Sequence, residues 1–567
     1  MGDRNSVAHS FIKALERRGI EHVFANAGTD HAPIVEALCA MQAQGIPTPK
    51  FHVIPHENLA MAMAQGYYRA SGKPAVVLVH VTIGTANTIC SLMNARRANV
   101  PVLLVAGKSP LSQEGHAGSR SVPIHWGQDA FDQSALVREY TKWEHELRAY
   151  QSIDALVDRA LTIAMSEPRG PVYLTLPREL LTDPDPTEPG TLSPAVVPAE
   201  PDGDAIAALA DKLAAAEKPA IITSTIGVDR ESRLLLEEIA EDHAIPVLQS
   251  WPYAINIRSE HPMNMRMDYA QWLETADLVL AIDTPVPWVP RRSKPKPDAT
   301  IVHLGPDPSF ATYSYRDFPA SQMIAGSPKA GLQLLGEALR HVAVDAERIE
   351  RRRNEVIGIV QRAARERAAL QASAKNDEPI SAVWITACIN QAKPKDAVIL
   401  NELAVPFNHH EFSGDEIYVG ETTAGGLGTA IGAGLGAKLG DPQRLVICCV
   451  GDGSYMFSNP TAALVVSRAL AVPVLIIVTN NGMWYAVEQS TVDIFPHGET
   501  ASSDAVPLTQ FGESPNYAMM AEACGAYGET VTRPDELPAA IERGIECNRN
   551  GQAAVINVIT APGSRIA

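Results

Sequence analysis

The sequence predicts an α/β protein built of three doubly wound parallel-sheet domains, and two observations support this prediction. Apolar runs of five or six residues, the length of a buried strand, alternate with segments of helical periodicity along most of the chain. The alternation occurs three times, and stretches of different composition separate the three blocks. Strands that alternate with helices are typical of parallel sheets, and 567 residues are too many for one core.

The first domain is predicted to cover residues 1–190. A helix is expected at 7–19, where Val7, Phe11 and Leu15 share one face. The other expected elements are helices at 33–41 and 58–72 and strands at 22–24, 51–54, 74–80, 100–105 and 171–176. Residues 181–204 contain six prolines and are therefore predicted to form an extended linker.

The central domain is predicted at 200–345 and the third at 375–567, with a charged helical connector at 346–376 between them. The central domain is expected to have helices at 205–216 and 231–242 and strands at 220–224, 245–248, 278–282 and 300–304. The third is expected to have strands at 397–400, 445–450, 474–478 and 554–559 and helices at 516–525 and 535–548. The arginines of the connector are interpreted as a solvated helix face.

Composition excludes several classes of function. A net charge of −18 argues against nucleic acid or an anionic membrane as the main partner. The seven cysteines form no CxxC pair, which disfavours a disulfide framework or a zinc site. The N-terminus has no apolar signal region and no stretch could span a bilayer, so a cytoplasmic protein is predicted.

Polar residues follow two apolar runs of the third domain. Gly451-Asp452-Gly453-Ser454 ends the run 445–450, and Asn481 follows the run 474–478. The carboxyl ends of parallel strands are where ligands bind, and glycines allow a phosphate to approach the backbone. Asp452 and Asn481 offer the hard oxygen ligands that Mg²⁺ prefers.

The spacing of this Gly-Asp-Gly turn and the later Asn-Asn pair resembles the diphosphate motif of thiamine-diphosphate enzymes. With three α/β domains in this order, the chain is similar to the superfamily of 2-oxo acid decarboxylases and acetolactate synthases. The resemblance implies a pyrimidine-binding first domain, a central domain and a diphosphate-binding third domain. It also implies that Asp452, Asn481 and the Met483 carbonyl bind Mg²⁺, while Gly451, Gly453 and Ser454 border the cofactor.

Two further motifs carry the resemblance. Glu57, in HVIPHENLAMAMAQGYYRASGKP, stands where the family places the glutamate that activates the cofactor's pyrimidine. The run from Ala424 to Gly428 resembles the family's AGGLG segment. There Leu427 would wedge beneath the cofactor, and the Gly425 carbonyl would accept a hydrogen bond from its amine. The alternative for Glu57 is a structural role at the N-terminal end of a helix. The alternative for the run from Ala424 to Gly428 is a segment that packs one helix against another.

The candidate substrate-side residues rest on a closer resemblance to benzoylformate decarboxylases in FANAGT and LVHVTIGTANT. Thr29 and His80 take the positions of a serine and a histidine that contact the substrate carboxylate and move protons. Glu488 stands where relatives often place a polar substrate-side group. A purely structural His80 is the alternative.

Other segments depart from that pattern. Residues 115–143 resemble acetolactate synthases, and the Gly and Arg pattern for FAD is weak, so FAD is not expected. The pair His409-His410 matches no known pattern of the family, and both a substrate-facing role and a loop role stay open.

The resemblance implies a thiamine-diphosphate- and Mg²⁺-dependent lyase that decarboxylates a 2-oxo acid, or cleaves or forms a C–C bond beside a carbonyl, through an enamine. Its substrate would be a 2-oxo acid or aldehyde, and acyloin carboligation could accompany decarboxylation. The alternatives are a transferase of the acetolactate-synthase type and a catalytically silent scaffold. Active sites between subunits, in a homodimer or homotetramer, are expected.

Overall fold

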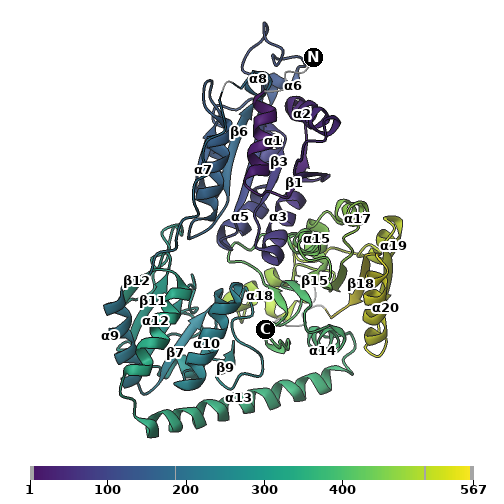
Figure 1. Ribbon diagram of the computed structural model, residues 1–567. Helices are drawn as coiled ribbons and strands as arrows, with labels where there is room; N and C mark the ends of the chain where they lie inside the picture. The colour runs from purple at the N-terminus through teal and green to yellow at the C-terminus, as the bar shows by residue number, and fades with distance from the viewer. Residues whose placement is uncertain (1–5, 186, 504–505, 562–567) are drawn as a thin grey trace.

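Three parallel six-stranded sheets, each covered by helices, make up the protein in a computed structural model that describes residues 6–185, 187–503 and 506–561 (Figure 1). This confirms the predicted fold class. The exact limits of the three domains stay predictions.

The first sheet has the strand order β2-β1-β3-β4-β6-β5. In that order the strands are Lys50–Val53, His22–Asn26, Ala75–Val79, Val102–Lys108, Val172–Pro177 and Glu144–Glu146. The helices are α1 (Val7–Arg17), η1 (Thr29–His31), α2 (Ala32–Ala43), α3 (Glu57–Ser71), α4 (Val81–Asn87), α5 (Ile89–Arg97), α6 (Ile124–Gly127), η2 (Ser134–Leu136), η3 (Arg138–Tyr140), α7 (Ile153–Met165) and α8 (Arg178–Thr182). Residues 187–202 contain neither helix nor strand, as their prolines predict.

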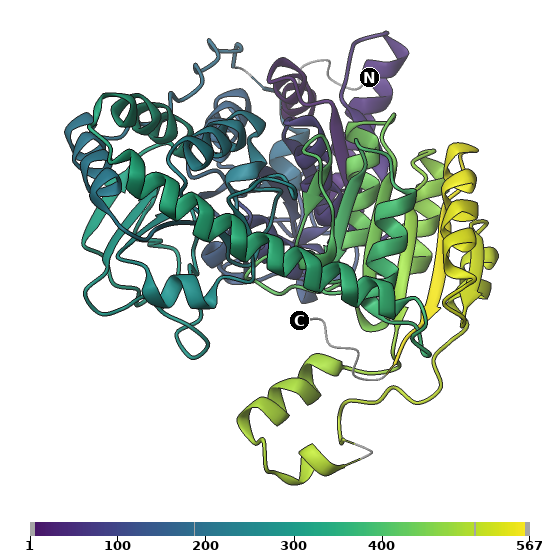
Figure 2. The same cartoon turned by 90° about the horizontal axis from the view of Figure 1, so that it is seen from below.

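The central sheet has the order β12-β11-β10-β7-β8-β9. Its strands are Gln322–Ala325, Thr300–Gly305, Leu278–Ile282, Pro219–Thr223, Val247–Gln249 and Asn264–Arg266. The helices are α9 (Gly203–Ala215), η4 (Ile226–Val228), α10 (Arg230–Asp242), α11 (Ala270–Thr275) and α12 (Pro328–His341). The connector is the long helix α13 (Ala346–Ala374), which crosses from the central to the third domain (Figure 2).

The third sheet has the order β14-β13-β15-β16-β18-β17. Its strands are Ile417–Val419, Val398–Glu402, Val446–Gly451, Leu475–Asn480, Ala554–Ile559 and Tyr527–Val531. The helices are α14 (Ala382–Ala392), η5 (Phe407–His409), α15 (Ala430–Gly440), α16 (Asp452–Phe457), α17 (Pro460–Ala469), α18 (Tyr485–Ile494), η6 (Glu499–Ser502), α19 (Tyr517–Ala523) and α20 (Leu537–Arg549). None of the described helices combines the length and apolarity needed to cross a bilayer.

The first and third domains share one apolar core, which α3 and α15 bring together. Glycines make this helix contact close: a Cβ on Gly66 would lie 1.7 Å from the Ala433 carbonyl oxygen, and one on Gly436 would lie 1.9 Å from that of Met63. Because no larger residue fits there, the two helices form a joint that places their N-terminal ends relative to each other.

Candidate active site

Glu57 is buried at the start of α3, beside the carboxyl edge of the first sheet. Its side chain is 8% exposed, and Oε2 accepts a hydrogen bond of 3.1 Å from the Asn87 side chain. The His56 ring precedes it as the helix cap and accepts from the Asn58 N–H. A Cβ on Gly84 would lie 3.5 Å from Glu57 Oε1, so the carboxylate faces the α4 turn.

His80 follows β3 at the same edge. Its Nδ1 lies 2.5 Å from Asp30 Oδ1, and Asp30 is only 2% exposed. The hydrogen bond with Asp30 raises the pKa of His80 above its usual value, against the opposing effect of burial. Burial alone would raise the pKa of the Asp30 carboxyl, but His31 and His80 hold it below its usual value. The pair is therefore an ionised carboxylate beside a readily protonated imidazole.

Thr29 is exposed at the start of η1, and its Oγ1 lies 3.5 Å from His125 Nε2. The Ser121 N–H donates to His125 Nδ1, which leaves the proton of the neutral ring on Nε2, toward Thr29. The structure thus brings Thr29, His80 and Glu57 to one sheet edge and adds Asp30 and His125. The sequence reasoning did not single out these two residues.

The polar residues of the third domain meet at the edge formed by β15 and β16. Asp452 begins α16, its Oδ1 accepts from the Gly453 N–H, and its Oδ2 accepts from the Gly482 N–H at 2.6 Å. Asn481 Oδ1 accepts from the Met483 N–H at 3.1 Å. Burial raises the pKa of the Asp452 carboxyl, because removal from water disfavours its ionised form. A bound cation would offset this desolvation cost.

The donor set at this edge fits Mg²⁺ and a diphosphate. Each accepting oxygen of Asp452 and Asn481 has a second lone pair free for a metal. A Cβ built on Gly451 would meet nothing within 4 Å, so open space adjoins the turn. At Gly453, by contrast, a Cβ would lie 2.2 Å from the Trp484 ring, and Ser454 is buried behind the turn.

The segment before α15 is anchored by Glu402, at the end of β13. The Glu402 carboxylate accepts from the backbone N–H groups of Gly428, Thr429 and Ala430 at 2.5, 2.9 and 2.7 Å. Gly425 has a φ of 64°, and a Cβ there would meet open space. The Leu427 carbonyl oxygen lies 3.6 Å from Cys90 Sγ of the first domain.

Glu488 makes no described hydrogen bond or ion pair with the other predicted residues. It lies in α18, part of a segment that extends away from the sheets (Figure 2). In the part of the chain that the structure describes, no hydrogen bond or ion pair joins Glu488, Glu57 or His80 to the turn at Asp452.

The vicinal histidines lie between the central and third domains. His410 is fully buried, stacks on Phe412 with ring centroids 5.3 Å apart, and has a pKa lowered to about 3 by burial. Arg266 of the central domain donates to the carbonyl oxygen of His410, and Asn390 donates to that of His409. This environment favours the loop role for the pair.

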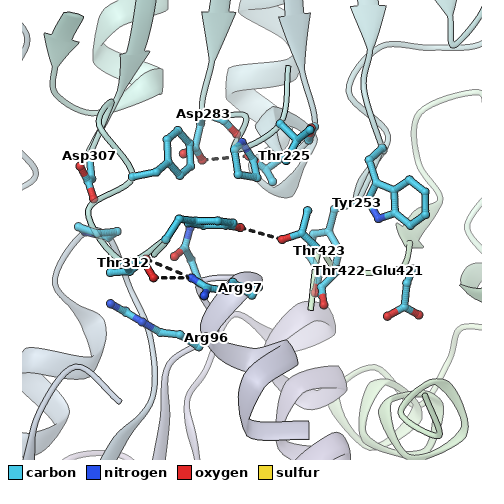
Figure 3. Close-up of a pocket in the computed structure, with 18 residues that line it drawn as sticks. Arg96, Arg97, Thr225, Tyr253, Asp283, Asp307, Thr312, Glu421, Thr422 and Thr423 are labelled. Atoms are coloured by element: carbon cyan, nitrogen blue, oxygen red, sulfur yellow. Dashed lines mark hydrogen bonds between the residues drawn. The ribbon is translucent and has the colours of Figure 1, made fainter. Parts of the chain in front are cut away.

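A cavity lies where all three domains meet (Figure 3). Charged residues from each domain line it: Arg96, Arg97, Asp283, Asp307 and Glu421. Burial, with Glu402 nearby, raises the pKa of Glu421 to about 9. The expectation that no FAD binds to the central domain stays a prediction.

Comparison with known proteins agrees with the three-domain fold. Three family models match the chain: the N-terminal thiamine pyrophosphate (TPP) binding domain at residues 5–136, the central domain at 206–335 and the C-terminal TPP binding domain at 405–558. The chain belongs to the thiamine pyrophosphate enzyme family.

Relatives of this chain include decarboxylases and synthases. It is 26% identical to a probable 2-ketoarginine decarboxylase of Pseudomonas aeruginosa, over 94% of this chain and 90% of that protein. It is 25% identical to benzoylformate decarboxylase of the same species, over 85% and 87%, and 23% identical to acetolactate synthase of Bacillus subtilis, over 96% and 91%. A solved 4-hydroxybenzoylformate decarboxylase of Rhodococcus jostii RHA1 superposes with a TM-score of 0.78 at 21% identity, covering 99% and 100% of the two chains.

Proposed function

We propose that this protein is a thiamine-diphosphate- and Mg²⁺-dependent lyase that decarboxylates a 2-oxo acid. The observation that carries the proposal is the edge of the first sheet, where a buried carboxylate, Glu57, lies near a histidine that is readily protonated, His80. Decarboxylation with aldehyde release consumes a proton at the carbon that loses CO₂, so it requires such a donor.

The residues of the third domain would hold the cofactor's charged end. Asp452, Asn481 and the Met483 carbonyl supply hard oxygen ligands for Mg²⁺, and Gly451 leaves room beside them. Thiamine diphosphate, when bound, supplies the electron sink that the departing CO₂ requires. Gly425 and Leu427 would support its ring.

The first-domain residues would act on protons and on the substrate. Glu57 would hold a proton on the cofactor's pyrimidine, Thr29 would orient the substrate carboxylate, and His80 would deliver a proton from Nε2. Glu488, on α18, would approach the substrate from the third domain. The active site is proposed to form between two copies of the chain, as a homodimer or homotetramer.

One observation supports that assembly. Apolar side chains face solvent on α16 and α19: Met456 is 38%, Phe457 55% and Met519 63% exposed. The two helices lie together, because the Tyr455 and Tyr517 rings are 4.9 Å apart, and apolar side chains gathered on one surface are typical of sites that bind another protein.

The test is CO₂ release from a panel of aliphatic, aromatic and guanidino 2-oxo acids, with thiamine diphosphate and Mg²⁺ present. CO₂ and the matching aldehyde are expected from at least one acid, and acyloin products in the presence of added aldehyde would show carboligation. Acetolactate formed from pyruvate alone would instead support the synthase-type transferase. Failure to bind the cofactor, measured by calorimetry, would support a silent scaffold.

A further inference from the structure

The turn that presents His80 is held by one carboxylate. Asp30 Oδ1 accepts from His80 Nδ1 at 2.5 Å, and Asp30 Oδ2 lies 3.3 Å from the Val81 N–H. The residue that carries the imidazole and the one that follows it are therefore both bonded to Asp30, which lies 50 positions earlier in the chain.

The backbone at this turn is strained. Val81 has a φ of 30°, which a β-branched side chain rarely adopts. Conformations of this kind persist only where the surroundings impose them, and they concentrate at functional sites. The hydrogen bond from the Val81 N–H to Asp30 is one of the contacts that impose it here.

Two glycines leave room for the pair. A Cβ on Gly28 would lie 2.0 Å from His80 Nδ1, and a Cβ on Gly107 would lie 1.6 Å from Asp30 Oδ2. Any larger residue at either position would displace the imidazole or the carboxylate. Residues after β1, after β3 and on β4 thus converge on a single hydrogen bond.

The neighbouring histidine does not compete for Asp30. His31 Nδ1 accepts from the Gly28 N–H at 3.0 Å, so it has no hydrogen for the carboxylate 3.4 Å away. Besides Asp30 and His31, the titratable groups near His80 are Glu57 on α3 and His125 on α6. Of these titratable groups, Asp30 is the one that bonds to the ring, and the neutral Gln128 side chain beside the ring also favours the protonated imidazole.

We propose that Asp30 is the positioning residue of His80: it holds the hydrogen of Nδ1 and the adjoining backbone, so that Nε2 delivers the proton in catalysis. This role rests on the proposed decarboxylation. In the step, a C–H bond forms at the substrate-derived carbon and the Nε2–H bond breaks, leaving its electron pair on nitrogen. Nδ1 keeps its hydrogen, Asp30 stays ionised, and water restores the proton on Nε2.

The test measures the protonation of His80 without substrate. The full chain, with and without thiamine diphosphate and Mg²⁺, is treated with diethyl pyrocarbonate from pH 5 to 9. This reagent acylates neutral imidazole, and peptide mass spectrometry gives the rate at His80. The midpoint is expected above the ordinary histidine pKa of about 6.5 in the wild type and about one to three units lower in Asp30→Asn.

The matched control is Asp154→Asn. Asp154 is also a buried aspartate with a cationic partner, Arg17 at 2.6 Å, but it lies on α7 outside the site. Its variant is expected to leave the His80 midpoint unchanged. A wild-type midpoint at or below about 6.5, or equal midpoints in wild type and Asp30→Asn, would overturn the proposal. If Asp30→Asn does not fold, the wild-type midpoint alone decides.

A kinetic arm separates this proposal from the proposed function. With a 2-oxo acid that the wild type decarboxylates, kcat is expected to fall as the pH rises through the His80 pKa. In Asp30→Asn that limb should move to lower pH by the same amount as the modification midpoint, with KM changed less than about threefold. A moved midpoint with an unmoved kcat limb would refute the role of Asp30 in catalysis. Absence of any decarboxylation in the wild type would refute the proposed function instead.

Discussion

The joint between α3 and α15 gives the sharpest structural prediction, and Gly436→Ala is the change that tests it. A Cβ at this position would lie 1.9 Å from the Met63 carbonyl oxygen and 2.8 Å from the Tyr67 nitrogen. A normal carbon–oxygen contact is about 3.3 Å, so the helices would have to separate by about 1.4 Å. Both obstructing atoms belong to the backbone of α3, and neither can rotate away.

The expected cost follows from two opposing effects. Overpacking a well-filled core costs about 1–3 kcal/mol, and a rigid backbone obstacle favours the upper end. Replacing glycine by alanine inside a helix returns about 1 kcal/mol. We therefore expect Gly436→Ala to destabilise the chain by about 2 kcal/mol. Since α3 carries Glu57, a shift of about 1 Å there should also lower kcat by about 10²-fold.

The assay compares urea midpoints at one protein concentration with the control Gly358→Ala. Gly358 lies in α13, where a Cβ would meet nothing within 4 Å. That variant should gain up to about 1 kcal/mol from helix propensity alone. A Gly436→Ala protein as stable as the Gly358→Ala protein would refute the reasoning about the joint.

Three further predictions concern single carboxylates. Glu57→Gln should keep the fold and cofactor binding but slow exchange of the C2 proton of bound thiamine diphosphate at least about 10²-fold, because an amide cannot hold the proton on the cofactor's pyrimidine. Exchange rates measured by NMR at the wild-type level would contradict the role assigned to Glu57. Asp452→Ala should weaken Mg²⁺-dependent cofactor retention, measured by calorimetric titration, and unchanged affinity would remove it from the metal site. Burial raises the pKa of Glu421 to about 9. Below about pH 4.5 this carboxyl is protonated in both the folded and the unfolded chain, so its stabilising protonated form is fully present. Stability is then lost as the pH rises toward 9, because the unfolded chain gives up this proton at a lower pH than the folded one. Glu421→Gln should therefore match the wild type in urea midpoint at pH 5 and exceed it at pH 8; equal midpoints at pH 8 would be inconsistent with a buried, protonated Glu421.

The sequence could predict the central strands because burial leaves a clear pattern. Strands such as β10 and β18 are covered on both faces and read as continuous apolar runs, and their bounds match those expected, 278–282 and 554–559. Five short strands were not predicted: β5, β9, β12, β14 and β17. Each lies at the edge of its sheet, and β5 reads Glu-His-Glu. Their conformation comes from pairing with one neighbour, which leaves little local signal.

The site was predictable where function depends on local chemistry. Asp452 and Asn481 stand directly after apolar runs, so their place at a sheet edge follows from the pattern. Asp30 and Glu402 were missed because their partners are distant in sequence: His80 for one, the N–H groups of residues 428–430 for the other. A polar residue at the carboxyl end of a predicted strand was the signal available for Glu402.

The geometry of the joint links the two halves of the candidate site. Gly432 lies against Leu59 and Ala62 while Gly436 lies against Met63, so α3 and α15 run in the same direction. Their N-terminal ends, which carry Glu57 and the segment before residue 430, therefore lie at the same end of the pair. A displacement of either helix moves the carboxylate and the glycine segment together, although they have no hydrogen bond to each other in the described chain. If two copies of the chain assemble as proposed, the Glu57 and the third domain of one chain belong to two different active sites. The core that these two domains share then makes the position of Glu57 in the first site depend on the third domain that completes the second.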